Sequence, residues 1–167
     1  MRTKAFVLWL LTAAPVLADS ALRASLALPD KYREAIVRVS ADNGSPNPQD
    51  WYFICRAAHS NEGIVSFTVR NRKILSQKPS LDMRVLLGDF SAIDLSQVQV
   101  DSRGAWEIAR RYVANEKGVA LGSVCFLLTQ KGQGASPIWS LWNYAPDGSY
   151  IGLLKILAST GDVIQWE

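Results

Sequence analysis

The stretch PIWSLWNYAPDGSYIGLLKILASTGDVI, residues 137–164, consists of three apolar runs separated by two turns. The first turn contains Pro146, Asp147 and Gly148, where Pro fixes φ and Gly accepts a positive φ. The second turn is STG, residues 159–161. Turns this short join antiparallel strands, because a parallel crossover needs a dozen or more residues. The stretch therefore predicts an antiparallel meander with strands over 137–145, 149–157 and 162–166.

The first of these strands carries aromatic residues on both sides. Alternation points Trp139 and Leu141 one way and Ile138, Trp142 and Tyr144 the other. An antiparallel sheet with one face in water would show polar residues on one of these sides. The sheet is therefore either covered on both faces, or one of its faces is free to bind a partner. Because aromatic residues fill cores more often than binding sites, coverage on both faces is the ordinary interpretation.

A helix is predicted immediately before this sheet, over residues 101–118. Asp101 and Ser102 supply the N-terminal cap, and Gly118 supplies the stop. One face of the helix is apolar and has helical spacing: Ala105, Ile108, Ala109 and Tyr112. The run SVCFLLTQ, residues 123–130, and the glycine-rich turn KGQG, residues 131–134, then lead into the meander. The second half of the chain thus predicts one helix followed by four strands.

The first half shows the same order. A helix is predicted over residues 30–43, capped by Asp30 and stopped at Asn43–Gly44, with apolar spacing at Tyr32, Ala35, Ile36 and Val39. Strands follow at WYFICRAA, residues 51–58, and IVSFTVR, residues 64–70, around the turn HSNEG, residues 59–63. An irregular bridge over 79–100 includes two further predicted strands, RVLLGDF (84–90) and LSQVQV (95–100).

Together these patterns predict an α+β fold of two helix-plus-antiparallel-meander units in tandem, with the helices packed on the sheet. The first unit with its bridge covers residues 19–95 and the second covers 96–167. Whether the two units share one sheet is left open by the sequence.

The N-terminus has the pattern of an export signal over residues 1–18. Arg2 and Lys4 precede the apolar run Ala5–Leu11, and the small-residue site VLA ends at Ala18. Removing this segment lowers the Lys and Arg count from 18 to 16 against 15 Asp and Glu, so the net charge falls from +3 to +1. Nucleic-acid binding, which depends on a basic surface, loses its main support. We expect an exported protein, periplasmic or extracellular, without a transmembrane anchor after cleavage.

The second half resembles the PepSY-like domains of exported bacterial proteins. The segments DSRGAWEIA (101–109), PIWSLWNY (137–144), the DG turn (147–148) and ASTGDVI (158–164) follow that family's order. The family commonly has Asp shortly before the A-x-T-G turn, where this chain has Leu157. The first half resembles the same unit more faintly. The resemblance implies a small non-catalytic module that binds or regulates a peptidase or another envelope protein.

Catalytic and metal-binding motifs are weak in this sequence. His59 is the single histidine and lies in a predicted turn, so a two-histidine metal motif is impossible. Cys55 and Cys125 lie within apolar runs, which suits buried thiols as well as a disulfide. The spacing of Asp82, Asp89, Asp94 and Asp101 does not fit a calcium loop. We therefore predict no enzyme activity, no cofactor and no metal site.

Three functional hypotheses remain. The leading one is a protein-binding module whose candidate face carries four aromatic residues: Trp139, Trp142, Tyr144 and Tyr150. The alternative is a small apolar-ligand binding protein with a pocket between helix and sheet. A third, a hydrolase that uses Cys55 or Cys125 with His59, would require these atoms to meet in an open cleft.

Overall fold

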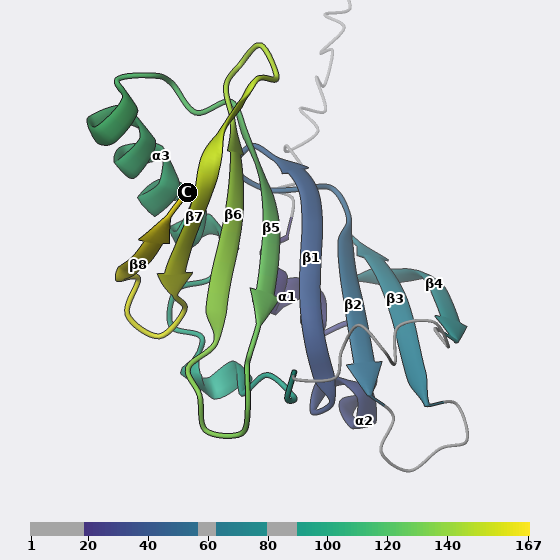
Figure 1. The fold of residues 1–167 in the computed structure, drawn as a ribbon. Helices are drawn as coiled ribbons and strands as arrows, with labels where there is room; N and C mark the ends of the chain where they lie inside the picture. Colours follow the sequence, from purple (N-terminus) through teal and green to yellow (C-terminus); the bar gives the residue numbers. More distant parts are fainter. Residues whose placement is uncertain (1–18, 57–62, 80–89) are drawn as a thin grey trace, which may run out of the picture.

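The computed structural model describes residues 19–56, 63–79 and 90–167, and these form one eight-stranded antiparallel sheet with helices on one face (Figure 1). The strand order is β4-β3-β2-β1-β5-β6-β7-β8, so two four-stranded meanders meet where β1 pairs with β5. The first meander contains β1 (Ile36–Gly44), β2 (Trp51–Arg56), β3 (Ile64–Arg70) and β4 (Lys73–Pro79). The second contains β5 (Ser123–Thr129), β6 (Ile138–Tyr144), β7 (Tyr150–Leu157) and β8 (Val163–Trp166).

The predicted fold of two helix-plus-meander units is wrong. One sheet runs through both halves, and the long helix predicted over residues 30–43 is absent. Its place is taken by α2 (Asp30–Arg33), which spans a single turn, and by β1. In β1, Val39 and Ala41 are buried in the main core and alternate with the more exposed Arg38, Ser40 and Asp42, and this period of two overrides the coincidental helical spacing. Ile36, Val37 and Val39 are β-branched, which also favours a strand.

The helix predicted in the second half is confirmed as α3 (Ser102–Lys117). The Asp101 carboxylate accepts a hydrogen bond from the Ser102 backbone N–H at 2.7 Å, and Gly118 ends the helix with φ of 67°. Ala105, Ala109 and Val113 are buried along the face that meets the sheet. Caps at both ends and a single apolar stripe explain why local sequence was sufficient for this element.

Most of the predicted strands are confirmed as β2, β3 and β5 to β8. The strand predicted over 95–100 is wrong, because Asp94 accepts from the Ser96 N–H and begins a 3-10 helix, Leu95–Gln97. The exposed strand β4 was not predicted. The RVLLGDF strand, apart from Phe90, and the HSNEG turn, apart from Gly63, lie outside the described residues.

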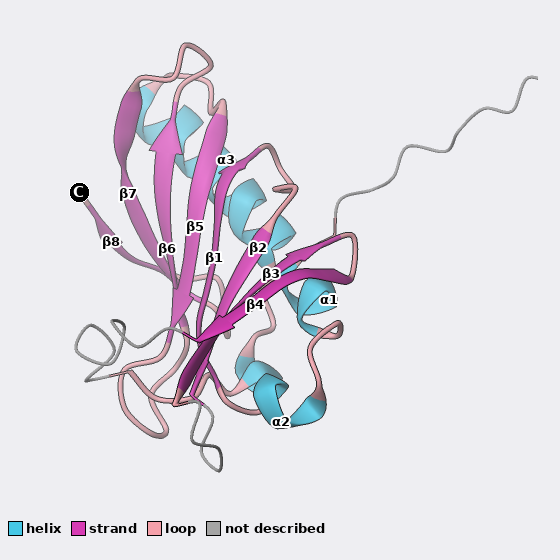
Figure 2. Cartoon of the chain, turned by 90° about the vertical axis from the view of Figure 1, so that its right-hand side faces the viewer, coloured by secondary structure: helices cyan, strands magenta, loops and turns pink. Residues whose placement is uncertain are grey.

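The main hydrophobic core lies between the helices and one face of the sheet. Figure 2 shows α1 (Ala21–Ser25), α2 and α3 on the same side of the strands. The largest fully buried aromatic side chains come from both meanders: Trp51, Phe53, Phe67, Phe126 and Trp139. Phe126 contacts both Trp51 and Trp139, with ring centroids 5.8 Å and 6.1 Å apart. This aromatic chain crosses the β1–β5 junction on the helix side and joins the two meanders into one core.

Candidate functional site

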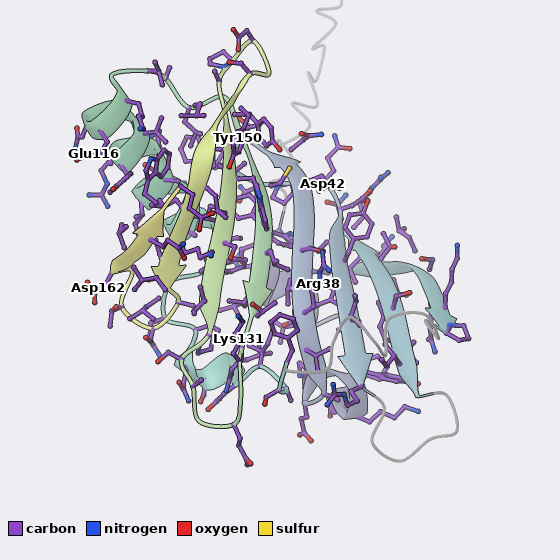
Figure 3. All side chains as sticks on the ribbon, in the orientation of Figure 1. Arg38, Asp42, Glu116, Lys131, Tyr150 and Asp162 are labelled. Atoms are coloured by element: carbon purple, nitrogen blue, oxygen red, sulfur yellow. The ribbon has the colours of Figure 1, made fainter. Side chains whose placement is uncertain are left out.

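The opposite side of the sheet, which we call the open face, carries no helix among the described residues (Figure 2). The strand register arranges its side chains in rows across the strands. The upper row contains Cys125, Trp142 and Leu153; the middle row contains Tyr52, Ser40, Leu127, Ser140 and Lys155; and the lower row contains Ile54, Arg38, Thr129, Ile138 and Leu157. Figure 3 looks onto this face.

On β5, β6 and β7 this face is apolar and partly accessible. Leu127, Ile138 and Trp142 are half-buried, while Leu153 retains 9% exposure. A single half-buried apolar residue on a surface is ordinary, but a contiguous group across three strands marks an interaction surface. The open face of β5 to β7 is therefore the candidate site.

Of the four aromatic residues predicted for the binding face, Trp139 does not belong to it. It has 0% exposure, and its indole N–H donates to the Val100 carbonyl at 2.8 Å in the core. Trp142 is half-buried on the open face, as the alternation in β6 predicts. The sequence did not reveal on which side of β6 the helices lie, so it could not separate Trp139 from Trp142.

The two tyrosines form the upper end of the candidate site. The rings of Tyr144 and Tyr150 are tilted against each other with centroids 5.7 Å apart, and Tyr150 is 55% exposed. Desolvation raises the pKa of Tyr144, with smaller contributions from nearby Cys125, Tyr150 and Asp42. The Tyr144 hydroxyl therefore stays protonated at neutral pH and remains a hydrogen-bond donor.

The two cysteines are free thiols in the structure, so the disulfide left open by the sequence is not formed. Cys55 lies on the helix side of β2, and Cys125 lies on the open face of β5. They also lie near opposite ends of β1, since Cys55 pairs with Ile36 and Cys125 lies beside the Ala41–Gly44 bulge. A disulfide requires Cα atoms about 4.4–6.8 Å apart, which this arrangement does not offer.

We expect the two thiols to differ sharply in reactivity. Burial raises the pKa of Cys55 to about 12, so at pH 8 only about one molecule in 10⁴ carries the reactive thiolate. Titration of the native protein with an aromatic disulfide reagent should modify Cys125 before Cys55, and Cys55 should react only after unfolding in guanidinium. Cys125→Ser should remove the fast phase. Two fast phases in the native protein would contradict the burial of Cys55.

Arg38 and Asp42 are open-face residues that the sequence did not single out, because residues 30–43 were predicted as a helix. The arginine lies in the lower row between Ile54 and Thr129. Its Nε is buried and has no hydrogen-bond partner. Asp42 follows Ala41 and lies at the upper row, close enough to Tyr144 to affect its pKa. Within the described part of the chain, neither residue forms an ion pair.

The described residues contain no group of three or more His, Cys, Asp and Glu that could hold a metal ion. His59 lies outside them, so its distance from either cysteine is not defined. Across 19–56, 63–79 and 90–167, no helix has the length and apolarity needed to cross a bilayer.

Two grooves lie at the ends of the strands. A polar groove of about 530 Å³ at the β1–β2 turn includes Asp42, Asp50 and Tyr52. A second, of about 620 Å³, lies at the opposite end of β1 and includes Glu34, Arg56 and Gln130. Neither groove lies between α3 and the sheet, where Ala105, Ala109 and Trp139 are fully buried.

No family model, curated protein or solved structure matches this chain. The resemblance to PepSY-like domains therefore stays a prediction.

Proposed function

We propose that this protein is an exported, non-catalytic binding module that holds another protein against the open face of its sheet. One observation carries the proposal. The helices cover one face of the sheet, while the other face presents half-buried Leu127, Ile138 and Trp142 with no helix over them among the described residues. At the lower end of β1 to β3, the same face is covered by Phe90, which packs against Val37, Ile54 and Ile64. Apolar side chains in one accessible surface favour a protein partner, because their burial on binding is favourable.

The composition of this surface supports a protein as its occupant. Trp and Tyr carry a large share of binding energy at protein interfaces, and Trp142, Tyr144 and Tyr150 line the upper part of the face. Tyr52 on β2 adds a ring with 39% exposure in the middle row. The predicted export signal over residues 1–18 favours an envelope or extracellular protein as the partner. Regulation of a peptidase is the specific role that the PepSY resemblance suggests.

A small apolar ligand between helix and sheet has less support. Ala105, Ala109 and Trp139 pack in that interface, each with 0% exposure, so the space between helix and sheet is filled. A ligand pocket would instead be concave and lined by accessible apolar side chains. The two grooves described above have this concavity, but they contain mixed charged and amide groups.

Trp142→Ala tests the proposal. The protein, produced from the full chain, is immobilised and exposed to extract from its own cell envelope. We expect a specific bound protein, and we expect the truncation to weaken its binding by about 30-fold or more, because an interface tryptophan contributes about 2 kcal/mol or more.

The matched control is Trp106→Ala on α3. Trp106 is also half-buried, but it lies on the helix side of the sheet, where its ring contacts the Arg110 guanidinium at 5.8 Å. Circular dichroism must first show that both variants fold. Equal loss of binding in both variants, or retention in Trp142→Ala, would rule out the open face as the binding surface.

A further inference from the structure

The open face of β1 carries two charges of opposite sign, and neither has an ion-pair partner among the described residues. Arg38 and Asp42 are four residues apart on the same strand face, which is about 13 Å along the strand. Ser40 lies midway between them in the middle row. Figure 3 labels both charged residues on this face of β1. A partner that satisfies both must present an acid and a base with the same spacing and the opposite order.

We infer that the protein covering the open face is a second copy of this chain, packed face to face about a two-fold axis. The axis lies between the two sheets, perpendicular to the strands, and crosses the middle row at Ser40. This operation exchanges the upper and lower rows, so Arg38 of each copy faces Asp42 of the other. The interface therefore contains two identical ion pairs that are related by the axis, as two-fold symmetry requires. The inference rests on the proposed function and names the partner.

The same axis also matches the apolar strands. It places β5, β6 and β7 against their own copies, because the axis runs across the strands. Trp142 of one copy then faces Ile138 of the other, and Leu153 faces Leu157. Leu127 lies on the axis and meets itself. One operation thus pairs opposite charges on β1 and apolar side chains on β5 to β7, and an unrelated partner would not require such symmetry.

The interface centres on β1 and β5 to β7, because Phe90 already packs against Val37, Ile54 and Ile64 at the lower end of the face over β1 to β3. Two sheets packed in this way lie about 10 Å apart, as in a β-sandwich.

Lys155 is the one charged residue of the middle row, so the two-fold axis places it towards Lys155 of the second copy. Its ammonium group donates to the Gln165 side-chain oxygen at 2.8 Å and lies 3.8 Å from the Glu167 carboxylate. This local acid offsets the lysine charge.

Charge exchange tests the inference. Sedimentation equilibrium should show a dimer for the unaltered protein at micromolar concentration. Arg38→Asp or Asp42→Arg puts like charges together at both contacts, and each should raise the dimer Kd by about 30-fold or more. The double variant Arg38→Asp/Asp42→Arg should return to within about threefold of the starting Kd. A mixture of the two single variants should form a heterodimer, because each then supplies the charges that the other lacks.

Cross-linking gives a second measurement that does not depend on the charged variants. In a Cys125→Ser background, Ser40→Cys places a thiol on the axis, and a short bis-maleimide should join two copies. The control is Ser66→Cys on β3, also half-buried, in the register row of Ile54 and therefore away from the axis. It should cross-link at least tenfold more slowly.

The outcomes separate this inference from the proposed function. A protein that is monomeric at high micromolar concentration overturns the inference, as does a double variant or a mixture that fails to recover dimerisation. If such a monomer still captures an envelope protein and loses it with Trp142→Ala, the proposed function stands. If it neither dimerises nor captures a protein, both fail.

Discussion

Trp139→Ala should lower the free energy of unfolding by about 3–5 kcal/mol, a typical cost of truncating a fully buried tryptophan. The indole fills the space between β6 and the segment that leads into α3, and its N–H satisfies the Val100 carbonyl at 2.8 Å. Removing it leaves a cavity beside Phe126 and a partly buried carbonyl without its donor. In a protein of this size, we expect the melting temperature to fall by about 10 °C or more.

The control for this prediction is Trp142→Ala, the same substitution three residues along the same strand. Trp142 lies on the open face and is half-buried, so its truncation should cost under about 1.5 kcal/mol. Urea unfolding of both variants measures the difference. Equal losses would mean that the two faces of β6 are equally covered, and the proposed function would then lose its basis.

The elements that local sequence predicted well contain their own start and stop signals. Helix α3 has Asp101 at one end and Gly118 at the other, and strand β3 has three buried residues in strict alternation. The turn at Pro146–Gly148 likewise separates β6 from β7. Such signals act over a few residues, so no knowledge of the tertiary fold is needed to read them.

The elements that were mispredicted depend on tertiary contacts. Asp30 begins a helix as expected, but that helix ends at Arg33 because Ile36 and the residues after it pair with both β2 and β5. No local signal reports that pairing. Strand β4 is mostly exposed and carries Lys73 and Lys78, so it lacks the apolar alternation of the inner strands. Charged residues of this kind are common on edge strands.

The candidate site was predictable in part, for the same reason. Alternation in β6 correctly placed Trp142 and Tyr144 on the side opposite Trp139. Which side faces the helices depends on the path of the chain after Val100, and no residue within β6 encodes it. Arg38 and Asp42 could have been placed on one face only by recognising β1 as a strand. The wrong prediction of a helix over residues 30–43 therefore led to the wrong fold. It also hid Arg38 and Asp42 as residues of the site.

Gly122→Ala should destabilise the protein by about 2–3 kcal/mol, although a single methyl group is added. Gly122 precedes β5, and its N–H donates to the Tyr144 carbonyl at 2.8 Å. A Cβ at this position would lie 2.6 Å from the backbone of Ala145 and Pro146. Backbone atoms cannot rotate away as a side chain can, so the start of β5 must separate from the end of β6.

Gly104→Ala in the first turn of α3 is the matched control for this prediction. Its added Cβ would lie 3.2 Å from the Val100 side chain, and alanine favours a helix over glycine by about 1 kcal/mol. We expect the free energy of unfolding to change by less than about 1 kcal/mol. Because the Gly122 strain acts directly on Tyr144, that variant should also loosen the Tyr144–Tyr150 ring pair, visible as a change in near-ultraviolet circular dichroism. A Gly122→Ala protein as stable as Gly104→Ala would show that the start of β5 and the β6–β7 turn are not in close contact. The arrangement described for the upper end of the open face would then be wrong.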